Sequence, residues 1–341
     1  MIIRNLKNVL NESNFKIFLD VEEIYAEAAL KQFDEENFNK SILFCNELIQ
    51  FNSSNYYSFY LLGCIYCKKG SFSRALIEFT KSLTLNKNNY LCFYYRGRCK
   101  YEVGDYYGAF KDFQSSIRLN RKYRKTYYWK AKSKMALDDY IGALNTLDEA
   151  FHLSPFDGYI GSSQNISIDQ CHLFALRAEC KYQLDQYESA INDLNKGILL
   201  DPKNYSNYFT RAECKYALFD YEGAIDDADK AISLNPMDHA SFYLRANIKF
   251  ELNDDKGAKS DLSKSIYLNP QNSLYLQFRC ELNIYLRNYH FAYKDIQKAL
   301  KIDPNDPISF KLKLVCKDKL SDIKQEFRLE YPENEIPDLD D

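Results

Sequence analysis

The residues that could carry metal or redox chemistry in this chain are its cysteines and histidines. Cys64 and Cys67 form a single CxxC motif, the spacing with which two thiolates bind Zn²⁺. A zinc site also needs a second such pair or two histidines at a suitable distance. The four histidines are instead scattered along the chain, at His152, His172, His239 and His290. We therefore expect no metal and no cofactor, and we expect reduced thiols that serve packing.

Arginine and aspartate form the other pattern that could do chemistry. Five arginines are each followed by an aspartate sixteen residues later: Arg96/Asp112, Arg177/Asp193, Arg211/Asp227, Arg245/Asp261 and Arg279/Asp295. A catalytic pair would not recur five times at one offset, so we predict a structural ion pair repeated along the chain. The sequence also shows no Gly-rich phosphate loop and no serine nucleophile elbow. It therefore predicts that the protein is not an enzyme.

These pairs belong to a sequence repeat. The pattern aromatic-x-x-Ala defines one anchor residue per repeat, with serine as the first anchor and Asp255 in place of the aromatic residue in the seventh repeat. The anchors are Ser41, Ala75, Ala109, Ala143, Ala190, Ala224, Ala258 and Ala292. The anchors are 34 residues apart, except for 47 between Ala143 and Ala190. Twelve residues before each anchor stands a small residue that lets two helices approach closely, and proline follows the last five anchors by twelve residues. Each repeat therefore predicts two helices of about 12–15 residues joined by a short turn.

The segments Tyr187-Glu188-Ser189-Ala190-Ile191 and Tyr221-Glu222-Gly223-Ala224-Ile225, each followed by Leu-x-Pro, resemble the tetratricopeptide repeat. The resemblance covers residues 22–306 and implies an all-α fold, an α-α superhelix. It would be a right-handed solenoid of eight helix-turn-helix repeats with a C-terminal capping helix.

The expected organisation follows from the anchors. We expect an N-terminal segment (1–21), repeats one to four (22–157), an inserted loop (158–170), repeats five to eight (171–306), a capping helix (307–329) and an acidic tail (330–341). The insertion is rich in Gly, Ser and Asn, so we expect a surface loop, with a hinge or a docking loop as the alternative.

By the same resemblance, the first helix of each repeat lines an inner groove. Its aromatic column is Tyr60, Tyr94, Tyr128, Phe209 and Tyr243. Its polar positions are Arg98, Lys132, Glu179, Glu213, Asn247 and Glu281, with Lys125 beside them. Rigid rings bury area at low entropic cost, so this column could hold a peptide or helix of a partner. The alternative is that some of these rings pack against the adjacent hairpin.

Charge is segregated along the chain. Residues 51–137 carry 17 Lys and Arg against 4 Asp and Glu, whereas the whole chain has a net charge of −3. The basic repeats favour an acidic ligand, and the net charge argues against nucleic acid. No apolar run is long enough to cross a membrane and the start lacks a secretory pattern, so we expect a cytoplasmic protein.

These observations predict a protein-interaction scaffold or adaptor. One alternative is co-chaperone-like binding of a client or chaperone. Relatives that clamp chaperone tails have lysine in the column where this sequence has Tyr and Phe, which argues against that clamp. Another alternative is an anionic ligand, RNA or a phosphorylated protein, at repeats two to four. The sequence does not indicate the partner or the oligomeric state.

Overall fold

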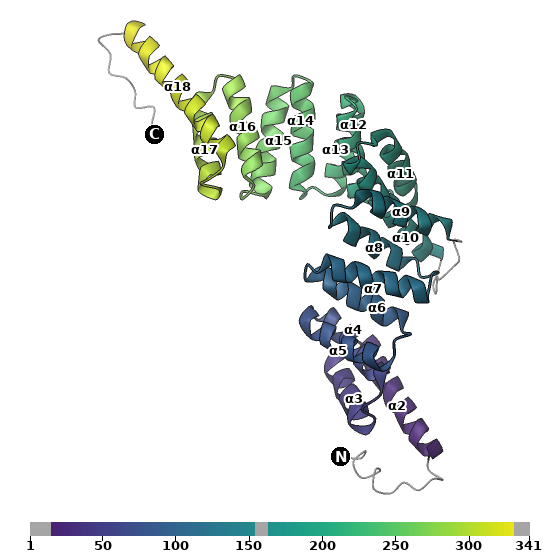
Figure 1. The fold of residues 1–341 in the computed structure, drawn as a ribbon. Helices are drawn as coiled ribbons and strands as arrows, with labels where there is room; N and C mark the ends of the chain where they lie inside the picture. Colours follow the sequence, from purple (N-terminus) through teal and green to yellow (C-terminus); the bar gives the residue numbers. More distant parts are fainter. Residues whose placement is uncertain (1–14, 154–162, 331–341) are drawn as a thin grey trace. The chain divides into compact units, whose positions relative to one another are not determined.

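The computed structural model of the chain describes residues 15–153 and 163–330 (Figure 1). Every regular element in these two ranges is a helix, which confirms the predicted all-α repeat fold. The chain forms two compact units, Met1–Leu184 and Asp185–Asp341, and each is described by itself.

The first unit contains five first helices and four second helices of successive repeats. They are α2 (Phe15–Asp34), α3 (Phe38–Phe51), α4 (Tyr56–Lys68), α5 (Phe72–Leu85), α6 (Tyr90–Glu102), α7 (Tyr106–Leu119), α8 (Lys125–Met135), α9 (Tyr140–His152) and α10 (Ser163–Gln183). The second unit continues with α11 (Tyr187–Leu200), α12 (Tyr205–Ala217), α13 (Tyr221–Leu234), α14 (His239–Glu251), α15 (Asp255–Leu268), α16 (Ser273–Tyr285), α17 (Tyr289–Ile302) and α18 (Pro307–Glu330).

Each hairpin turns through one residue with a left-handed backbone, five positions before the anchor. The turn residues are Glu36, Gly70, Gly104, Asp138, Asp185, Phe219, Asn253 and Arg287. Residues with a β-carbon adopt this region at a cost of about 1–2 kcal/mol, whereas glycine does so freely. Six of the eight turns in the described part of the chain therefore hold a strained residue that packing elsewhere must offset.

The core of a repeat depends on a pair of residues whose volumes complement each other. The small residue of the first helix meets a residue of the second helix sixteen positions later, and both are buried. Gly63 faces Phe79, and a β-carbon on Gly63 would lie only 2.6 Å from two atoms of that ring. Ala131 shares a core cluster with the smaller Leu147. Glycine on the first helix thus faces the larger phenylalanine, and alanine faces the smaller leucine. This match lets both hairpins fill the space between their two helices without voids.

Four of the five predicted ion pairs have both residues in the same unit, and the structure confirms these four: Arg96/Asp112, Arg211/Asp227, Arg245/Asp261 and Arg279/Asp295. In each, arginine Nε and Nη2 donate to the two carboxylate oxygens of aspartate at 2.5–2.9 Å. In three of them a lysine four residues after the arginine also contacts the aspartate at 2.7–2.9 Å. The aspartates are only 4–5% exposed, so these cations supply the charge compensation that a buried carboxylate needs. The pair Arg177/Asp193 spans the two units and stays a prediction.

Two helices begin within segments that were expected to lie outside the repeats. Helix α2 begins at Phe15, inside the segment 1–21 that was expected to precede the repeats. Residues 163–170 were expected in the inserted loop, yet they form the first turns of α10. The reason is compositional: Gly158 and Gly161 precede this stretch, and residues 163–170 contain neither glycine nor proline to end a helix.

The capping helix was expected over 307–329, and α18 runs from Pro307 to Glu330. Its start is capped by Asp306, which accepts a hydrogen bond from the backbone N–H of Ser309 at 2.8 Å. Residues 1–14 and 154–162, and all of the acidic tail after Glu330, lie outside the described residues.

Candidate functional site

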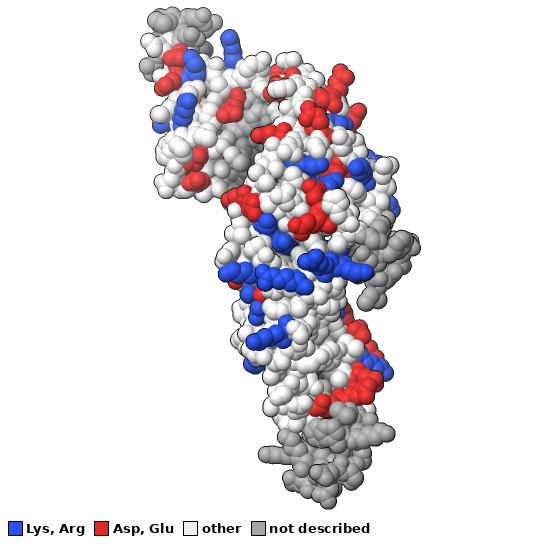
Figure 2. Space-filling model, turned by 45° about the vertical axis from the view of Figure 1, so that its right-hand side comes forward, with Lys and Arg blue, Asp and Glu red and all other residues white. Residues whose placement is uncertain are grey.

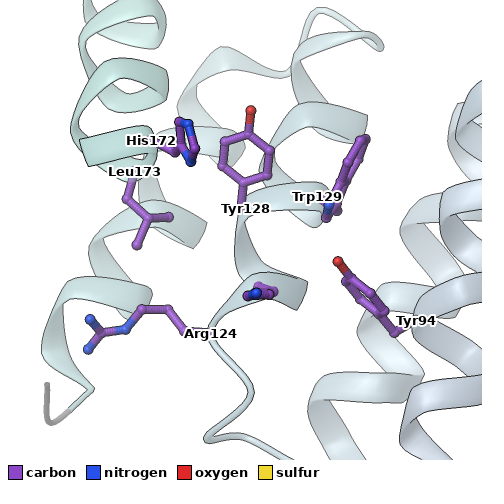
Figure 3. A pocket seen from close by; sticks show the side chains of 7 residues that line it. Tyr94, Arg124, Tyr128, Trp129, His172 and Leu173 are labelled. Carbon is purple, nitrogen blue, oxygen red and sulfur yellow. The ribbon is translucent and has the colours of Figure 1, made fainter. Parts of the chain in front are cut away.

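A hollow of about 260 Å³ opens on the first-helix face of the first unit. We call it the first hollow, and it is lined by Tyr94, Arg124, Lys125, Tyr128, Trp129, His172 and Leu173. Figure 3 shows Tyr128 flanked by His172 and Trp129, with the hydroxyl of Tyr94 directed towards Trp129. The ring centroid of Tyr128 lies 5.7 Å from that of Trp129 and 6.3 Å from that of His172. Helices α6, α8 and α10 therefore build one aromatic wall from three successive repeats.

The start of α8 differs from the other first helices. In most of them an Asn or Asp accepts a hydrogen bond from a backbone N–H in the first turn, as Asn55, Asn89 and Asn204 do. The residue 34 positions after Asn89 is Tyr123, whose ring packs on Tyr94 with centroids 5.2 Å apart. The cap is lost and an aromatic contact takes its place.

Two cations follow Tyr123 at this helix start. Arg124 is 4% exposed and its Nη2 donates to the carbonyl oxygen of Leu153 at 2.6 Å, which fixes the side chain. Lys125 is exposed. Cations at the positive end of a helix destabilise it by about 0.3–1 kcal/mol each. The arrangement is therefore unfavourable for α8 alone and concentrates positive potential at one end of the first hollow.

Cations also lie over the aromatic wall. The Arg98 guanidinium carbon is 4.7 Å from the Trp129 ring centroid, and Lys132 Nζ is 5.2 Å from the same ring. Such contacts stabilise by roughly 0.5–1 kcal/mol at exposed sites and hold the charge beside the rings. Burial raises the pKa of Tyr94 to about 12 despite the nearby Arg98, so its hydroxyl stays protonated at neutral pH.

A second hollow, of about 240 Å³, lies further along the same two helices α8 and α10. Its lining is Tyr101, Lys132, Met135, Ala136, Tyr140, Leu176, Glu179 and Gln183. Desolvation raises the pKa of Glu179, and the charge of Lys132 partly opposes that effect. This hollow therefore joins apolar surface to one cation and one carboxylate.

The structure brings five of the predicted site residues of the first unit to these hollows. Tyr94, Tyr128 and Lys125 line the first, and Lys132 and Glu179 line the second. The residues do not form a ladder of exposed rings, because Tyr94 is only 4% exposed and packs against Tyr95, Phe113 and Tyr123.

Tyr60 has the same character as Tyr94. It packs against Phe79 and Tyr95, with centroids 6.2 Å apart in both pairs. Tyr60 and Tyr94 therefore contribute to the packed floor of this face, and Tyr128 is the ring of the predicted column that walls the first hollow from α8.

In the second unit the predicted residues take part in packing within their own repeats. Phe209 packs against the core cluster around Ala212 and Ala224. Tyr243 lies 4.8 Å from the ring of Tyr275. Asn247 donates from Nδ2 to the carbonyl oxygen of Tyr243 at 2.8 Å. Glu213 is half-buried on α12 and Glu281 is exposed on α16, where desolvation raises the pKa of its carboxyl.

His172 and Leu173 line the first hollow but were not predicted as site residues. They stand in the fifth repeat, and the 47-residue spacing separates them from the α8 residues that they face. Trp129 was visible as the single tryptophan of the chain, and a lone tryptophan next to the aromatic column is the signal that could have placed it in the site.

Positive charge gathers around the first hollow. Arg118, Arg121 and Lys122 precede α8 and are exposed, as is Lys125. Figure 2 shows lysine and arginine side chains in a band at the level where Figure 1 labels α7 and α8. A surface with one sign of charge steers oppositely charged ligands towards it.

The thiols pack as predicted. All ten cysteines are free, nine of them are buried, and Cys64 shares a core cluster with Cys92 and Cys99. Within the described ranges, no group of three or more His, Cys, Asp or Glu side chains is placed to hold a metal ion. No helix among these residues is long and apolar enough to cross a membrane, and a cytoplasmic location stays a prediction.

Comparisons with known proteins agree with this architecture. A family model of the tetratricopeptide repeat matches residues 56–89, 172–204 and 239–272, which fall in repeats two, five and seven. No curated protein matches the chain.

Several solved structures share the fold. The APC/C hetero-tetramer Cut9–Hcn1 matches with a TM-score of 0.59 at 12% identity, over 82% of this chain and 52% of that one, so this chain spans about half of that relative. A tetratricopeptide repeat protein from Parabacteroides merdae gives a TM-score of 0.54 at 18% identity, over 77% of this chain and 98% of that one. The C-terminal part of a TPR repeat-containing protein from Cytophaga hutchinsonii gives 0.53 at 18% identity, over 73% and 97%.

At these identities the likeness to solved structures shows the fold alone, and the matches indicate no catalytic family. The family matches fall in phase with the 34-residue period. The chain carries tetratricopeptide repeats in an all-α repeat array, a fold that generally serves as a scaffold for protein–protein interaction.

Proposed function

We propose that the protein is a scaffold that holds an acidic segment of a partner protein on the first-helix face of repeats three to five. The observation that carries this proposal is the first hollow, where the rings of Tyr128 and Trp129, beside the packed ring of Tyr94, meet the cations Arg124 and Lys125. Aromatic rings that remain open to a hollow favour an apolar side chain, and the adjacent cations favour a carboxylate beside it.

The size of the first hollow supports a peptide side chain as its occupant. Pockets for drug-sized ligands and cofactors usually measure about 300–1,000 Å³. A hollow of about 260 Å³ is smaller, and it suits one bulky side chain of a peptide whose backbone continues along the surface. The second hollow, of about 240 Å³ on the same two helices, offers room for a second side chain.

The geometry of the wall supports binding by pre-organised residues. The carbonyl of Leu153 holds Arg124, and Trp129 is fixed between Tyr128 and the Arg98 guanidinium. Residues that are already ordered lose little entropy when a ligand binds, so a short segment can bind there with useful affinity.

A display selection tests the proposal. A library of random twelve-residue peptides is selected on the full chain, and the enriched peptides are measured by fluorescence polarisation against three variants. We expect peptides with an apolar residue next to carboxylates. We expect Tyr128→Ala and Lys125→Glu to weaken them by about tenfold, which corresponds to roughly 1.4 kcal/mol.

The matched control is Tyr107→Ala, which removes an exposed ring from the second helix α7. This variant should bind the enriched peptides within a factor of two of the wild type. Enriched peptides that bind all three variants equally would refute the proposed face. A single-stranded RNA that binds more tightly than every peptide, with an affinity that falls steeply with salt, would favour the anionic-ligand alternative instead.

A further inference from the structure

Four cysteines gather where repeat two packs against repeat three. Cys64 and Cys67 lie near the end of α4, and Cys92 and Cys99 lie on α6. Cys64, Cys92 and Cys99 belong to one buried core cluster, and Cys67 packs against it. All ten cysteines lie in the described ranges, and Cys67 is the one among them that is not buried. One thiol of this group is therefore open to solvent while its neighbours are sealed.

The thiols of Cys67 and Cys99 interact across the two helices. A hydrogen bond from the Cys99 thiol lowers the pKa of Cys67 to about 7 against the effect of burial; the nearby Arg98 lowers it further and Glu102 raises it. The same hydrogen bond, together with burial, raises the pKa of Cys99, so Cys99 keeps its proton. Because the thiolate is the nucleophile, Cys67 is the reactive member of this pair.

The other two thiols of the group are held inside the core. Burial raises the pKa of Cys92 to about 11, and its thiol donates to the carbonyl oxygen of Phe79 at 3.5 Å. Burial also raises the pKa of Cys64, whose sulfur accepts a hydrogen bond from the hydroxyl of Tyr60. Both thiols stay protonated at neutral pH, so the thiol that supports a reaction at Cys67 is Cys99 and not its CxxC neighbour Cys64.

We propose that Cys67 and Cys99 are a peroxide-sensitive pair that forms a disulfide between α4 and α6. The Cys67 thiolate attacks one oxygen of hydrogen peroxide, the O–O bond breaks, and the hydroxide that leaves takes up a proton to give water. Cys67 is then a sulfenic acid. The sulfur of Cys99 attacks the sulfur of Cys67, and the departing hydroxide leaves with the Cys99 proton as a second water. The peroxide accepts the two electrons that the two thiols lose.

The second unit supplies a comparison pair. Cys280 on α16 and Cys316 on α18 share a core cluster, and their sulfurs lie 3.9 Å apart. The contact with Cys280 also lowers the pKa of Cys316. Both side chains are 0% exposed, so this pair has the contact of two thiols without access for a peroxide. We therefore expect Cys280 and Cys316 to stay reduced while the chain is folded.

Disulfide mapping of the full chain tests the proposal. The reduced protein is treated with a small excess of hydrogen peroxide at neutral pH, the remaining thiols are blocked in denaturant, and chymotryptic peptides are identified by mass spectrometry without reductant. Chymotrypsin cleaves after Tyr66 and so separates Cys64 from Cys67. We expect the peptides of Cys67 and Cys99 to be linked at least about tenfold faster than those of Cys280 and Cys316. A link between Cys64 and Cys67, or equal rates for the two pairs, would overturn the inference.

Variants separate the roles of the two thiols. Cys99→Ser keeps a hydrogen-bond donor beside Cys67 but cannot close the disulfide, so it should accumulate a sulfenic acid at Cys67 that dimedone labels. Cys67→Ser should give neither the label nor the link. The matched control is Cys92→Ser, which removes a buried thiol of the same cluster and should form the link within a factor of two of the wild-type rate. A dimedone label at another cysteine in Cys99→Ser would refute the assignment of Cys67. The wild-type map needs no substitution, so it decides the proposal even if a variant fails to fold.

Discussion

The complementary packing of Gly63 and Phe79 makes a quantitative prediction. A β-carbon at position 63 would lie 2.6, 2.6 and 2.9 Å from three ring carbons of Phe79, where ordinary contacts measure 3.4–4 Å. Such overpacking costs about 1–3 kcal/mol, and alanine's better helix propensity returns about 1 kcal/mol. Three ring carbons lie closer than 3.0 Å, so the upper part of that range applies, about 2–3 kcal/mol. Gly63→Ala should therefore lower the free energy of unfolding by about 1–2 kcal/mol, although glycine is normally the worse helix residue.

A second substitution should restore the fit. Phe79→Leu alone leaves a cavity and loses contacts with Tyr60 and Tyr95, at a cost of about 1–2 kcal/mol. The double variant recreates the Ala131/Leu147 pair of repeat four, whose two residues are fully buried in one core cluster. Its cost should therefore be at least about 1.5 kcal/mol smaller than the sum of the single variants.

Urea unfolding followed by far-UV circular dichroism measures all four chains of this cycle. A Gly63→Ala chain as stable as the wild type, or single costs that add within about 0.5 kcal/mol, would show that the volumes at these two positions are independent. Either result refutes the packing argument.

Three further outcomes can be measured by thermal or urea unfolding. Asp227→Ala leaves the partly buried Arg211 without its carboxylate and should lower the free energy of unfolding by about 2–3 kcal/mol. Asp226→Ala, at the exposed neighbouring position, should lower it by under about 0.5 kcal/mol. Equal costs would contradict a structural role for the ion pair. Phe219→Gly relieves a turn residue at φ 62° and should stabilise by about 0.5–1 kcal/mol, and a loss of stability would show that the exposed ring matters more than the backbone. Desolvation raises the pKa of Glu179, so the contribution of this residue to stability falls as the pH rises through its folded-state pKa. Glu179→Gln should therefore be more stable than the wild type at pH 7 and equally stable well below the ordinary pKa of 4.5. An advantage of the same size at both pH values would refute the raised pKa.

The sequence could predict what every repeat must contain. Helix pairing, the anchor alanines and the Arg–Asp pairs are local requirements of one hairpin, so they recur at 34-residue intervals and stand out from a single sequence. The small column was visible for the same reason. Its matching residue sixteen positions later was not recognised, because that column varies from Phe to Ala and shows its meaning only when both residues are seen in contact.

The left-handed turn position shows a similar limit. It holds Gly70 and Gly104 but also Phe219 and Arg287, so residue type does not mark it. The turn geometry is imposed by the two helices that must pack together, and the packing energy offsets the strain of a residue with a β-carbon.

By itself, the sequence determined the all-α repeat fold, the absence of any catalytic pattern, and a first-helix column of aromatic and charged residues. Only the tertiary structure decided which of those rings close the floor and which wall a hollow. Tyr94 is sealed because Tyr123 stands where other repeats have a capping Asn or Asp, and Tyr128 meets His172 because α10 packs beside α8 across the longer spacing. The exposure of each ring depends on side chains from the adjacent hairpins. A periodic sequence pattern shows where a residue lies within its own repeat, but it does not show which side chains of the adjacent repeats surround it.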